Sequence, residues 1–200
     1  FAHYQREEAW TWEHMALTRA RMISGDPSLI DEAERIIEEV LAAPRDQAKT
    51  AKDVAEMRAL IEQEKPARDV WDLKLIPGGL VDIEFIAQYL ALVAPSKGHR
   101  VRTNELSTAD ALKALGALID PNDLDTCLTA LKLYTDLSQV IRLCIDGTFD
   151  PDKVPAGLTD RVARAADSPD VKTVETEVKR LSKAVRKVFS RVIAQDIKIS

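Results

Sequence analysis

The sequence contains few of the residues on which small folds without a large core depend. Cysteine occurs twice in 200 residues, and glycine (7) and proline (9) are also scarce. A chain of this length can bury a sizeable hydrophobic core, so its stability does not require disulfides or a structural metal. The scarcity of turn residues disfavours an all-β fold, and a hydrophobic content of 46% excludes a disordered chain. The composition favours a globular, helix-rich protein.

Long apolar runs and an excess of positive charge are also missing. No run approaches the roughly 18–20 apolar residues that cross a bilayer, and no charged-then-apolar leader precedes the first helical pattern. We therefore expect no membrane partner and a cytoplasmic location. Lysine and arginine (28) are outnumbered by aspartate and glutamate (33), which argues against nucleic acid as a partner. Because the chain begins with Phe1 inside a patterned segment, we expect it to be part of a longer protein.

Three pairs of a capping residue and a proline mark expected helix starts: Asp26-Pro27, Asp120-Pro121 and Ser168-Pro169. In each pair the first side chain accepts backbone N–H bonds, and proline takes the first helical position, where its missing donor costs nothing. Apolar residues recur every three or four positions between these marks, which predicts eight helices. Their expected ranges are Ala2–Ile23, Pro27–Ala43, Asp46–Lys65, Leu80–Ala94, Ser107–Leu118, Pro121–Asp146, Gly157–Ala166 and Pro169–Ile197.

Short loops between long amphipathic helices favour antiparallel packing. We therefore expect an all-α fold, an antiparallel helical bundle of about seven or eight helices, in which residues 1–200 form a single helical domain. The longer segments 67–79 and 95–106 do not divide the pattern into two cores. Cys127 and Cys144 fall in one helical pattern among apolar residues, which predicts inert thiols in the core.

The connector 67–79 is the first candidate for chemistry. Residues 71–75 alternate apolar and polar, which predicts an extended segment with Asp72 and Lys74 on one face. Gly78 and Gly79 then turn the chain into a helix. Backbone N–H groups at such a helix start suit an anion, and Lys74 would add a positive charge. A tight entry turn without a ligand is the alternative, and it is the commoner role of such glycines.

The helix after this turn is apolar nearly all round, which predicts burial on most sides. Asp82 and Glu84 on it need partners, because an unpaired buried carboxylate is costly. They either complement the helix N-terminus with an arginine as counter-ion, or position a basic residue or substrate at the wall of an active site. Arg19, Arg21 and Arg58 are the candidate arginines, and each is either a phosphate contact or an ordinary ion pair.

No motif in the chain supplies a catalytic or metal site by itself. Asp123 and Asp125 form a D-x-D pair, but residues two apart on a helix point about 200° apart and cannot chelate one ion. The three histidines lack the spacing of a zinc site, and no Walker loop or G-x-S-x-G motif occurs. We expect no catalytic residue and no metal ligand in this chain alone.

Three blocks stand out in order along the chain: AWTWEHMALTRAR at residues 9–21, DVAEMR at 53–58 and DLKLIPGGLVDIEF at 72–85. Together they resemble the family of glutamine synthetase adenylyltransferase/adenylyl-removing enzymes, also called glutamate–ammonia ligase adenylyltransferases, and their uridylyltransferase relatives. Members of this family have two nucleotidyltransferase halves, each followed by a helical domain. The GGLVDIEF form is more similar to the C-terminal, adenylylating half. The G-S-x-x-D-x-D motif and third carboxylate of the nucleotidyltransferase fold are absent from this chain.

The resemblance implies a helical domain that follows a catalytic fold and completes or orients its site. In this family, ATP and Mg²⁺ adenylylate a tyrosine of glutamine synthetase, under control of the PII signal protein and glutamine. ATP and Mg²⁺ are thus expected in the full-length enzyme and not bound to this chain. The residues expected to face the site or to position the nucleotide are Lys74, Gly78, Gly79, Asp82, Glu84, Arg19, Arg21 and Arg58.

An alternative function is a non-catalytic module that docks glutamine synthetase or PII and touches no nucleotide. Charged residues clustered around Lys74 and open to solvent would favour the catalytic role. A large exposed apolar patch elsewhere would favour the docking role.

Overall fold

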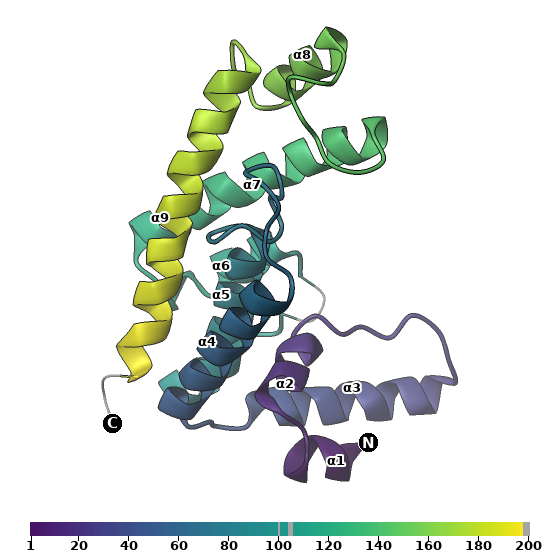
Figure 1. The fold of residues 1–200 in the computed structure, drawn as a ribbon. Coiled ribbons are helices and arrows are strands. Elements are labelled where there is room, and N and C mark those ends of the chain that lie inside the picture. Colours follow the sequence, from purple (N-terminus) through teal and green to yellow (C-terminus); the bar gives the residue numbers. More distant parts are fainter. Residues whose placement is uncertain (100, 104–105, 198–200) are drawn as a thin grey trace. The chain divides into compact units, whose positions relative to one another are not determined.

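The computed structural model describes residues 1–99, 101–103 and 106–197. These residues contain nine α-helices, two short 3₁₀ helices and no strand, which confirms the all-α prediction (Figure 1). The α-helices are α1 (Ala2–Glu7), α2 (Thr11–Leu17), α3 (Pro27–Ala42), α4 (Gln47–Glu64), α5 (Leu80–Val93), α6 (Thr108–Ala114), α7 (Pro121–Cys144), α8 (Ala156–Ala165) and α9 (Val171–Ile197). The 3₁₀ helices are η1 (Pro95–Lys97) and η2 (Gly116–Leu118). Within the described ranges, no helix is long and apolar enough to span a membrane.

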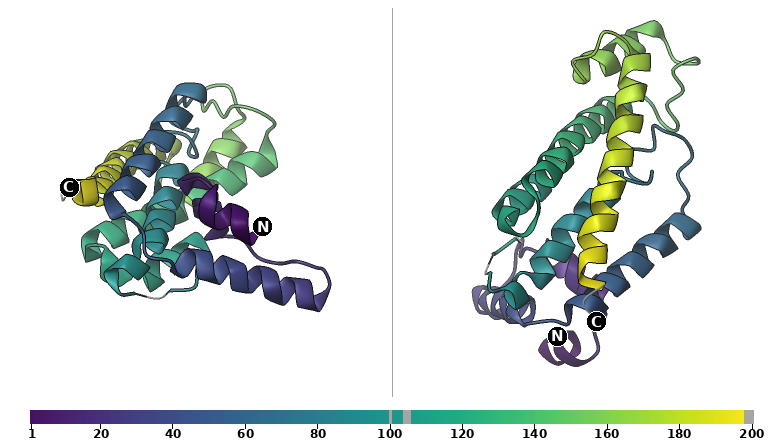
Figure 2. Two further views of the ribbon diagram at one scale, coloured as in Figure 1. Left: turned by 90° about the horizontal axis from the view of Figure 1, so that it is seen from below. Right: turned by 90° about the vertical axis from the view of Figure 1, so that its left-hand side faces the viewer.

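The chain forms two compact units. Unit 1 takes its described residues from Phe1–Ala59, Glu84–Pro121 and Arg191–Ser200, and unit 2 comprises Leu60–Ile83 and Asn122–Ser190. In unit 1, α1 and α2 lie against α3 (Figures 1 and 2). In unit 2, α8 leads into the N-terminal end of α9. That residues 1–200 form a single domain stays a prediction.

Most helix bounds agree with the predicted ranges to within two residues. As predicted, α3 begins at Pro27 and α7 at Pro121. The start of α9 was predicted wrongly: the helix begins at Val171, and the Asp170 carboxylate accepts a hydrogen bond from the Thr173 N–H at 2.7 Å. Asp170, and not the predicted pair Ser168-Pro169, therefore caps the first turn of this helix. The fifth predicted helix is present as α6 followed by η2.

The helix predicted over Ala2–Ile23 is instead two short helices, α1 and α2. The Glu13 carboxylate accepts a hydrogen bond from the Trp10 N–H at 2.8 Å, which caps a new helix start. At the other end of α2, the Thr18 hydroxyl donates to the Met15 carbonyl at 2.6 Å. Side chain-to-backbone bonds therefore interrupt a segment whose apolar spacing alone predicts one helix.

The two cysteines differ in burial. Cys127 is fully buried on α7, as predicted, and burial raises the pKa of its thiol to about 12. Cys144 is exposed, so the prediction of a second core thiol is wrong. It is the last residue of α7, next to Leu143, which is also exposed. The apolar pattern of α7 thus continues past the part of the helix that is covered.

A buried histidine joins three segments of unit 1. His14 Nε2 lies 2.8 Å from the carbonyl oxygen of Gln5, and its Nδ1 lies 2.7 Å from Nη1 of Arg45. Because a guanidinium only donates, Nδ1 accepts and Nε2 carries the proton of a neutral imidazole. Burial lowers the pKa of His14 below its ordinary value, and the positive charge of Arg45 lowers it further. Unit 1 therefore contains a buried histidine in its neutral form.

Acid is expected to destabilise the protein through His14. The unfolded chain takes up a proton as pH falls through about 6.5, whereas folded His14 resists it, so the free energy of unfolding falls below that pH. The slope contributed by this group is at most about 1.4 kcal/mol per pH unit. Urea unfolding at several pH values between about 7.5 and 5 measures it. His14→Gln should flatten this part of the profile, and an unchanged slope in that variant would contradict the assignment.

Gly78 makes a close backbone approach in unit 2. Its φ is +80°, and a Cβ there would lie 1.8 Å from the Ser182 carbonyl oxygen of α9. A Cβ on Gly79 would lie 2.5 Å from the Leu73 carbonyl oxygen. Neither backbone oxygen can move aside without disturbing the fold. Both positions therefore require glycine, Gly78 so that the turn can pack against α9 and Gly79 so that it can pack against Leu73.

Gly78→Ala is expected to destabilise the protein by about 3 kcal/mol or more, because it combines backbone strain with a steric overlap. Gly157→Ala is the matched control: Gly157 lies in α8, and a Cβ there would meet nothing within 4 Å. The control should be neutral or stabilising by less than about 1 kcal/mol. Urea unfolding of both variants measures the difference, and equal stabilities would show that the turn does not need glycine.

Candidate functional site

The connector 67–79 is a series of turns in unit 2 and not an extended segment. The N–H groups of Leu75 and Ile76 both donate to the Asp72 carbonyl oxygen, at 2.9 and 3.0 Å. The prediction of alternating faces is therefore wrong, because helix-like bonds over three and four residues replace extended backbone. The Lys74 side chain is nevertheless exposed.

Lys74 lines a cavity of about 250 Å³ in unit 2. Arg68, Arg142 and Trp71 line the same cavity. In the described part of the chain, no carboxylate pairs with Lys74 or with Arg142. Arg68 Nη1 donates to the Thr148 hydroxyl at 3.0 Å. The cavity is therefore lined by three cationic side chains, and one of them is Lys74, a site residue predicted from the sequence.

The backbone N–H groups at the start of α5 are engaged within unit 2. Those of residues 78–81 donate, in order, to the Asp82 carboxylate and to the carbonyl oxygens of Ile76, Leu73 and Lys74, at 2.6, 2.8, 2.9 and 3.2 Å. An anion at a helix N-terminus needs N–H groups that are free to donate to it. The geometry therefore favours the alternative of a tight entry turn, and the Asp82 carboxylate complements the positive end of the helix dipole.

Asp82 is fully buried and pairs with Arg186 of α9, a residue that sequence reasoning missed. Arg186 Nη1 lies 3.1 Å from Asp82 Oδ2, and its Nη2 lies 2.8 Å from Glu62 Oε1. The guanidinium also lies over the ring of Phe189, 5.3 Å from its centroid. In the sequence, Arg186 is one of a run of basic residues. Its position between Val185 and Val188, which are buried, was the only sign that its side chain could reach the core.

Glu84 and the three candidate arginines belong to unit 1. Glu84 Oε2 lies 3.1 Å from Nη1 of Arg19, so one predicted pairing is present. Arg21 is exposed, and no carboxylate of the described residues pairs with it. Arg58 is only 1% exposed on α4, so its guanidinium is not open to a ligand in this structure. The other four candidates, Lys74, Gly78, Gly79 and Asp82, belong to unit 2.

The Mg²⁺ that the resemblance implies has no ligand set in the described part of the chain. No three histidine, cysteine, aspartate or glutamate side chains there lie close enough to hold a metal ion. Asp123 is buried and Asp125 is exposed, as expected for residues two apart on one helix. These residues do not fit the metal, and we assign no chemical step to it.

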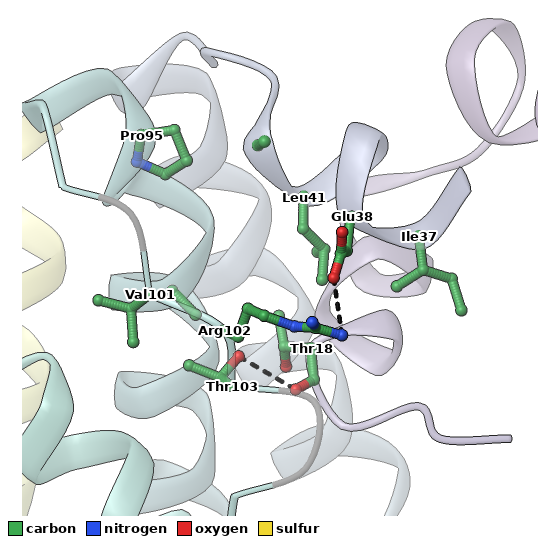
Figure 3. A pocket seen from close by; sticks show the side chains of 10 residues that line it. Thr18, Ile37, Glu38, Leu41, Pro95, Val101, Arg102 and Thr103 are labelled. Atoms are coloured by element: carbon green, nitrogen blue, oxygen red, sulfur yellow. Dashed lines mark hydrogen bonds and ion pairs between the residues drawn. The ribbon is translucent and has the colours of Figure 1, made fainter. Parts of the chain in front are cut away.

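A second cavity, of about 320 Å³, lies in unit 1 and has a largely apolar wall (Figure 3). The polar groups at this cavity bond to one another. Arg102 Nη2 lies 2.7 Å from Glu38 Oε1, and the Thr103 hydroxyl donates to the Thr18 carbonyl oxygen at 3.1 Å. None of the eight predicted site residues lines this cavity. The cation-lined cavity of unit 2 is therefore the stronger candidate.

Arg186→Met is expected to destabilise the protein by about 3 kcal/mol, because it removes the Arg186 charge from the buried Asp82 carboxylate. Adding Asp82→Asn should recover part of this loss, since the amide oxygen still accepts from Gly78. Arg180→Met on α9 is the control: Arg180 pairs with Glu177 at the surface, and its loss should cost less than about 1 kcal/mol. Urea unfolding measures the free energy of unfolding of each variant. Equal decreases in Arg186→Met and Arg180→Met would show that the buried pair stabilises the protein no more than a surface pair does.

Comparisons with known proteins match the chain to two family models and to curated enzymes that share one name. Residues 1–36 match the family model for glutamate-ammonia ligase adenylyltransferase, and residues 55–193 match the model for GlnD PII-uridylyltransferase. The bifunctional glutamine synthetase adenylyltransferase/adenylyl-removing enzyme of Rhizobium meliloti is 62% identical over 97% of the chain, and that of Agrobacterium fabrum is 58% identical over 96%. The enzyme of the same name from Mesorhizobium japonicum is 47% identical over 96% of the chain.

The chain spans about a fifth of the length of these curated relatives. The second model alone covers more than half of the chain, and the relatives match nearly all of it. The chain therefore belongs to the family that the PII-uridylyltransferase model describes, and nearly its whole length is similar to bifunctional glutamine synthetase adenylyltransferase/adenylyl-removing enzymes.

Proposed function

We propose that this chain is a helical part of a glutamine synthetase adenylyltransferase and helps to position ATP for the transfer of AMP to a tyrosine of glutamine synthetase. The observation that carries the proposal is the Lys74 side chain, which is exposed and lines a cation-rich cavity without a carboxylate partner among the described residues. Enzymes of phosphoryl and nucleotidyl transfer act largely by positioning phosphates and stabilising their charge. An ammonium group beside the phosphates serves that purpose.

Residues 55–193, which include Lys74, match the PII-uridylyltransferase model, and relatives named glutamine synthetase adenylyltransferase match nearly all of the chain. This overlap supports a role in the chemistry that the two kinds of enzyme share. An adenylyl donor and a uridylyl donor differ in the base and have the same phosphates. A helical part common to both enzymes is therefore better suited to hold phosphates than to recognise a base. The cations around Lys74 have the charge for this role.

The rest of the machinery belongs, in this proposal, to the full-length enzyme. ATP and Mg²⁺ act there, and the chain follows a nucleotidyltransferase fold in the C-terminal, adenylylating half. Glutamine synthetase is the protein substrate, the PII signal protein is a regulator, and the enzyme works in the cytoplasm. The relatives, which are about five times as long as this chain, have room for such a fold.

A docking module for glutamine synthetase or PII is the second candidate, because large aromatic side chains are exposed in α1 and α2 and at the residues that precede them. Trp10 is 70% exposed and Trp12 is 49% exposed, and Phe1 and Tyr4 are exposed as well. Aromatic side chains of this kind are frequent anchors of protein interfaces. Titration of this chain with glutamine synthetase and with PII, each separately, tests the docking role. Binding that is lost in a Trp10→Ala/Trp12→Ala variant would support it.

In the full-length enzyme, Lys74→Ala is expected to lower the rate of glutamine synthetase adenylylation at least about tenfold, because a fixed charge next to the phosphates is removed. Glu84→Ala should also lower the rate, because Arg19 loses its partner. Lys132→Ala is the control, since Lys132 is exposed on α7 and pairs with Asp136. Transfer of labelled AMP from ATP measures the rates, and circular dichroism checks folding. Wild-type rates in folded Lys74→Ala enzyme would reject the proposal.

A further inference from the structure

The cavity around Lys74 has more positive charge than its own carboxylates neutralise. Three cations line it, Arg68, Lys74 and Arg142, together with two carboxylates, Asp69 and Asp72. Asp69 Oδ1 accepts a hydrogen bond from the Trp71 N–H at 2.8 Å. The Asp72 side chain is only 13% exposed, and its Oδ2 lies 3.8 Å from Arg68 Nε. Both carboxylates are thus engaged locally, and the charges of Lys74 and Arg142 have no carboxylate to meet in the described part of the chain.

The wall of this cavity is held in place by contacts within unit 2. The ring of Trp71 meets that of Phe149 edge-on, with centroids 4.9 Å apart. Arg68 bonds to Thr148, which links the connector to the loop after α7. Because these contacts are short and involve buried or half-buried rings, the cations are presented from a framework that already has its shape.

The size and charge of the cavity limit what it can bind. A volume of about 250 Å³ is below the roughly 300–1,000 Å³ of sites that enclose whole drug-sized ligands. Several cations in one cavity suit a compact anion with several charges better than a single carboxylate. A nucleic acid is a poor match, because the whole chain has a net charge of −5.

We propose that this cavity is a binding site for a polyphosphate anion, formed by Arg68, Lys74 and Arg142. The inference rests on the proposed function, in which it names Arg68 and Arg142 as further positioning residues. In adenylyl transfer, the tyrosine oxygen forms a bond to the α-phosphorus of ATP, the bond from that phosphorus to the bridging oxygen breaks, and pyrophosphate leaves with the electron pair. The tyrosine proton passes to a base or to water. The three cations stabilise the negative charge on the pyrophosphate portion.

Tryptophan fluorescence provides a direct test of binding. The chain has three tryptophans, so a Trp10→Phe/Trp12→Phe background leaves Trp71, at the cavity wall, as the single emitter. This protein is titrated with sodium pyrophosphate at constant ionic strength. A saturable change with a dissociation constant on the order of 1 mM is expected. No change, or a change that potassium chloride reproduces, would overturn the proposal.

Variants in the same background test the assigned residues. Lys74→Gln and Arg142→Gln should each weaken pyrophosphate binding about tenfold, the value of one charge-assisted hydrogen bond. Arg161→Gln is the matched control, because Arg161 is an exposed arginine of unit 2 that does not line the cavity. Its affinity should be unchanged. Equal affinities in all three variants would overturn the assignment.

Titrations with ATP and with orthophosphate identify the source of the anion. Equal affinities for ATP and pyrophosphate would support the phosphate tail of the nucleotide as the ligand, and a preference for pyrophosphate would support the released product. Tighter binding of orthophosphate than of either would overturn the polyphosphate assignment.

The adenylylation rate of the full-length Lys74→Ala enzyme, compared with pyrophosphate binding by the chain, tests the anion site and the proposed function separately. Loss of activity in Lys74→Ala enzyme without pyrophosphate binding by the chain would reject only the anion site. Specific pyrophosphate binding with wild-type rates in Lys74→Ala enzyme would reject only the role in catalysis.

Discussion

The organisation of unit 2 depends on the hydrogen bond and ion pair that the buried Asp82 carboxylate forms. The carboxylate accepts the Gly78 N–H at the entry turn and pairs with Arg186 of α9, so one side chain joins the turn, the start of α5 and the longest helix. A carboxylate without solvent is stable only with such partners. Gly78 is required for the same contact, because any Cβ there would overlap the backbone of α9.

This internal bonding distinguishes the glycine turn of the connector from its exposed lysine. The glycine turn, for which the sequence leaves open an anion site or a tight entry turn, has its N–H groups engaged by the protein itself. The Lys74 backbone carbonyl takes part in that bonding, whereas its ammonium group stays exposed. The turn therefore holds the backbone of Lys74 in place, and the cavity beside it has Arg68 and Arg142 as additional cations. The motif positions a charge, and it does not itself offer an anion site.

Helix content and most helix bounds could be predicted from the sequence, because apolar periodicity and proline at the first helical position are local signals. The break between α1 and α2 could not, since it depends on the side chain-to-backbone bond of Glu13, and the end of α2 involves a similar bond of Thr18. The partner of Glu84 was among the predicted arginines, but Arg186, which pairs with Asp82, was not. Arg186 lies 104 residues from Asp82, and no local pattern distinguishes it from the other basic residues of α9. Long-range pairing of this kind needs the fold.

The comparisons and the geometry of Lys74 support one central proposal, that a positive charge at this position assists the transfer of AMP. Comparison of Lys74→Met with Lys74→Arg in the full-length enzyme tests it most directly, because methionine keeps much of the length and removes the charge, whereas arginine keeps the charge. The account predicts that adenylylation falls at least about tenfold with methionine and is largely retained with arginine. Equal rates in the two variants would contradict it.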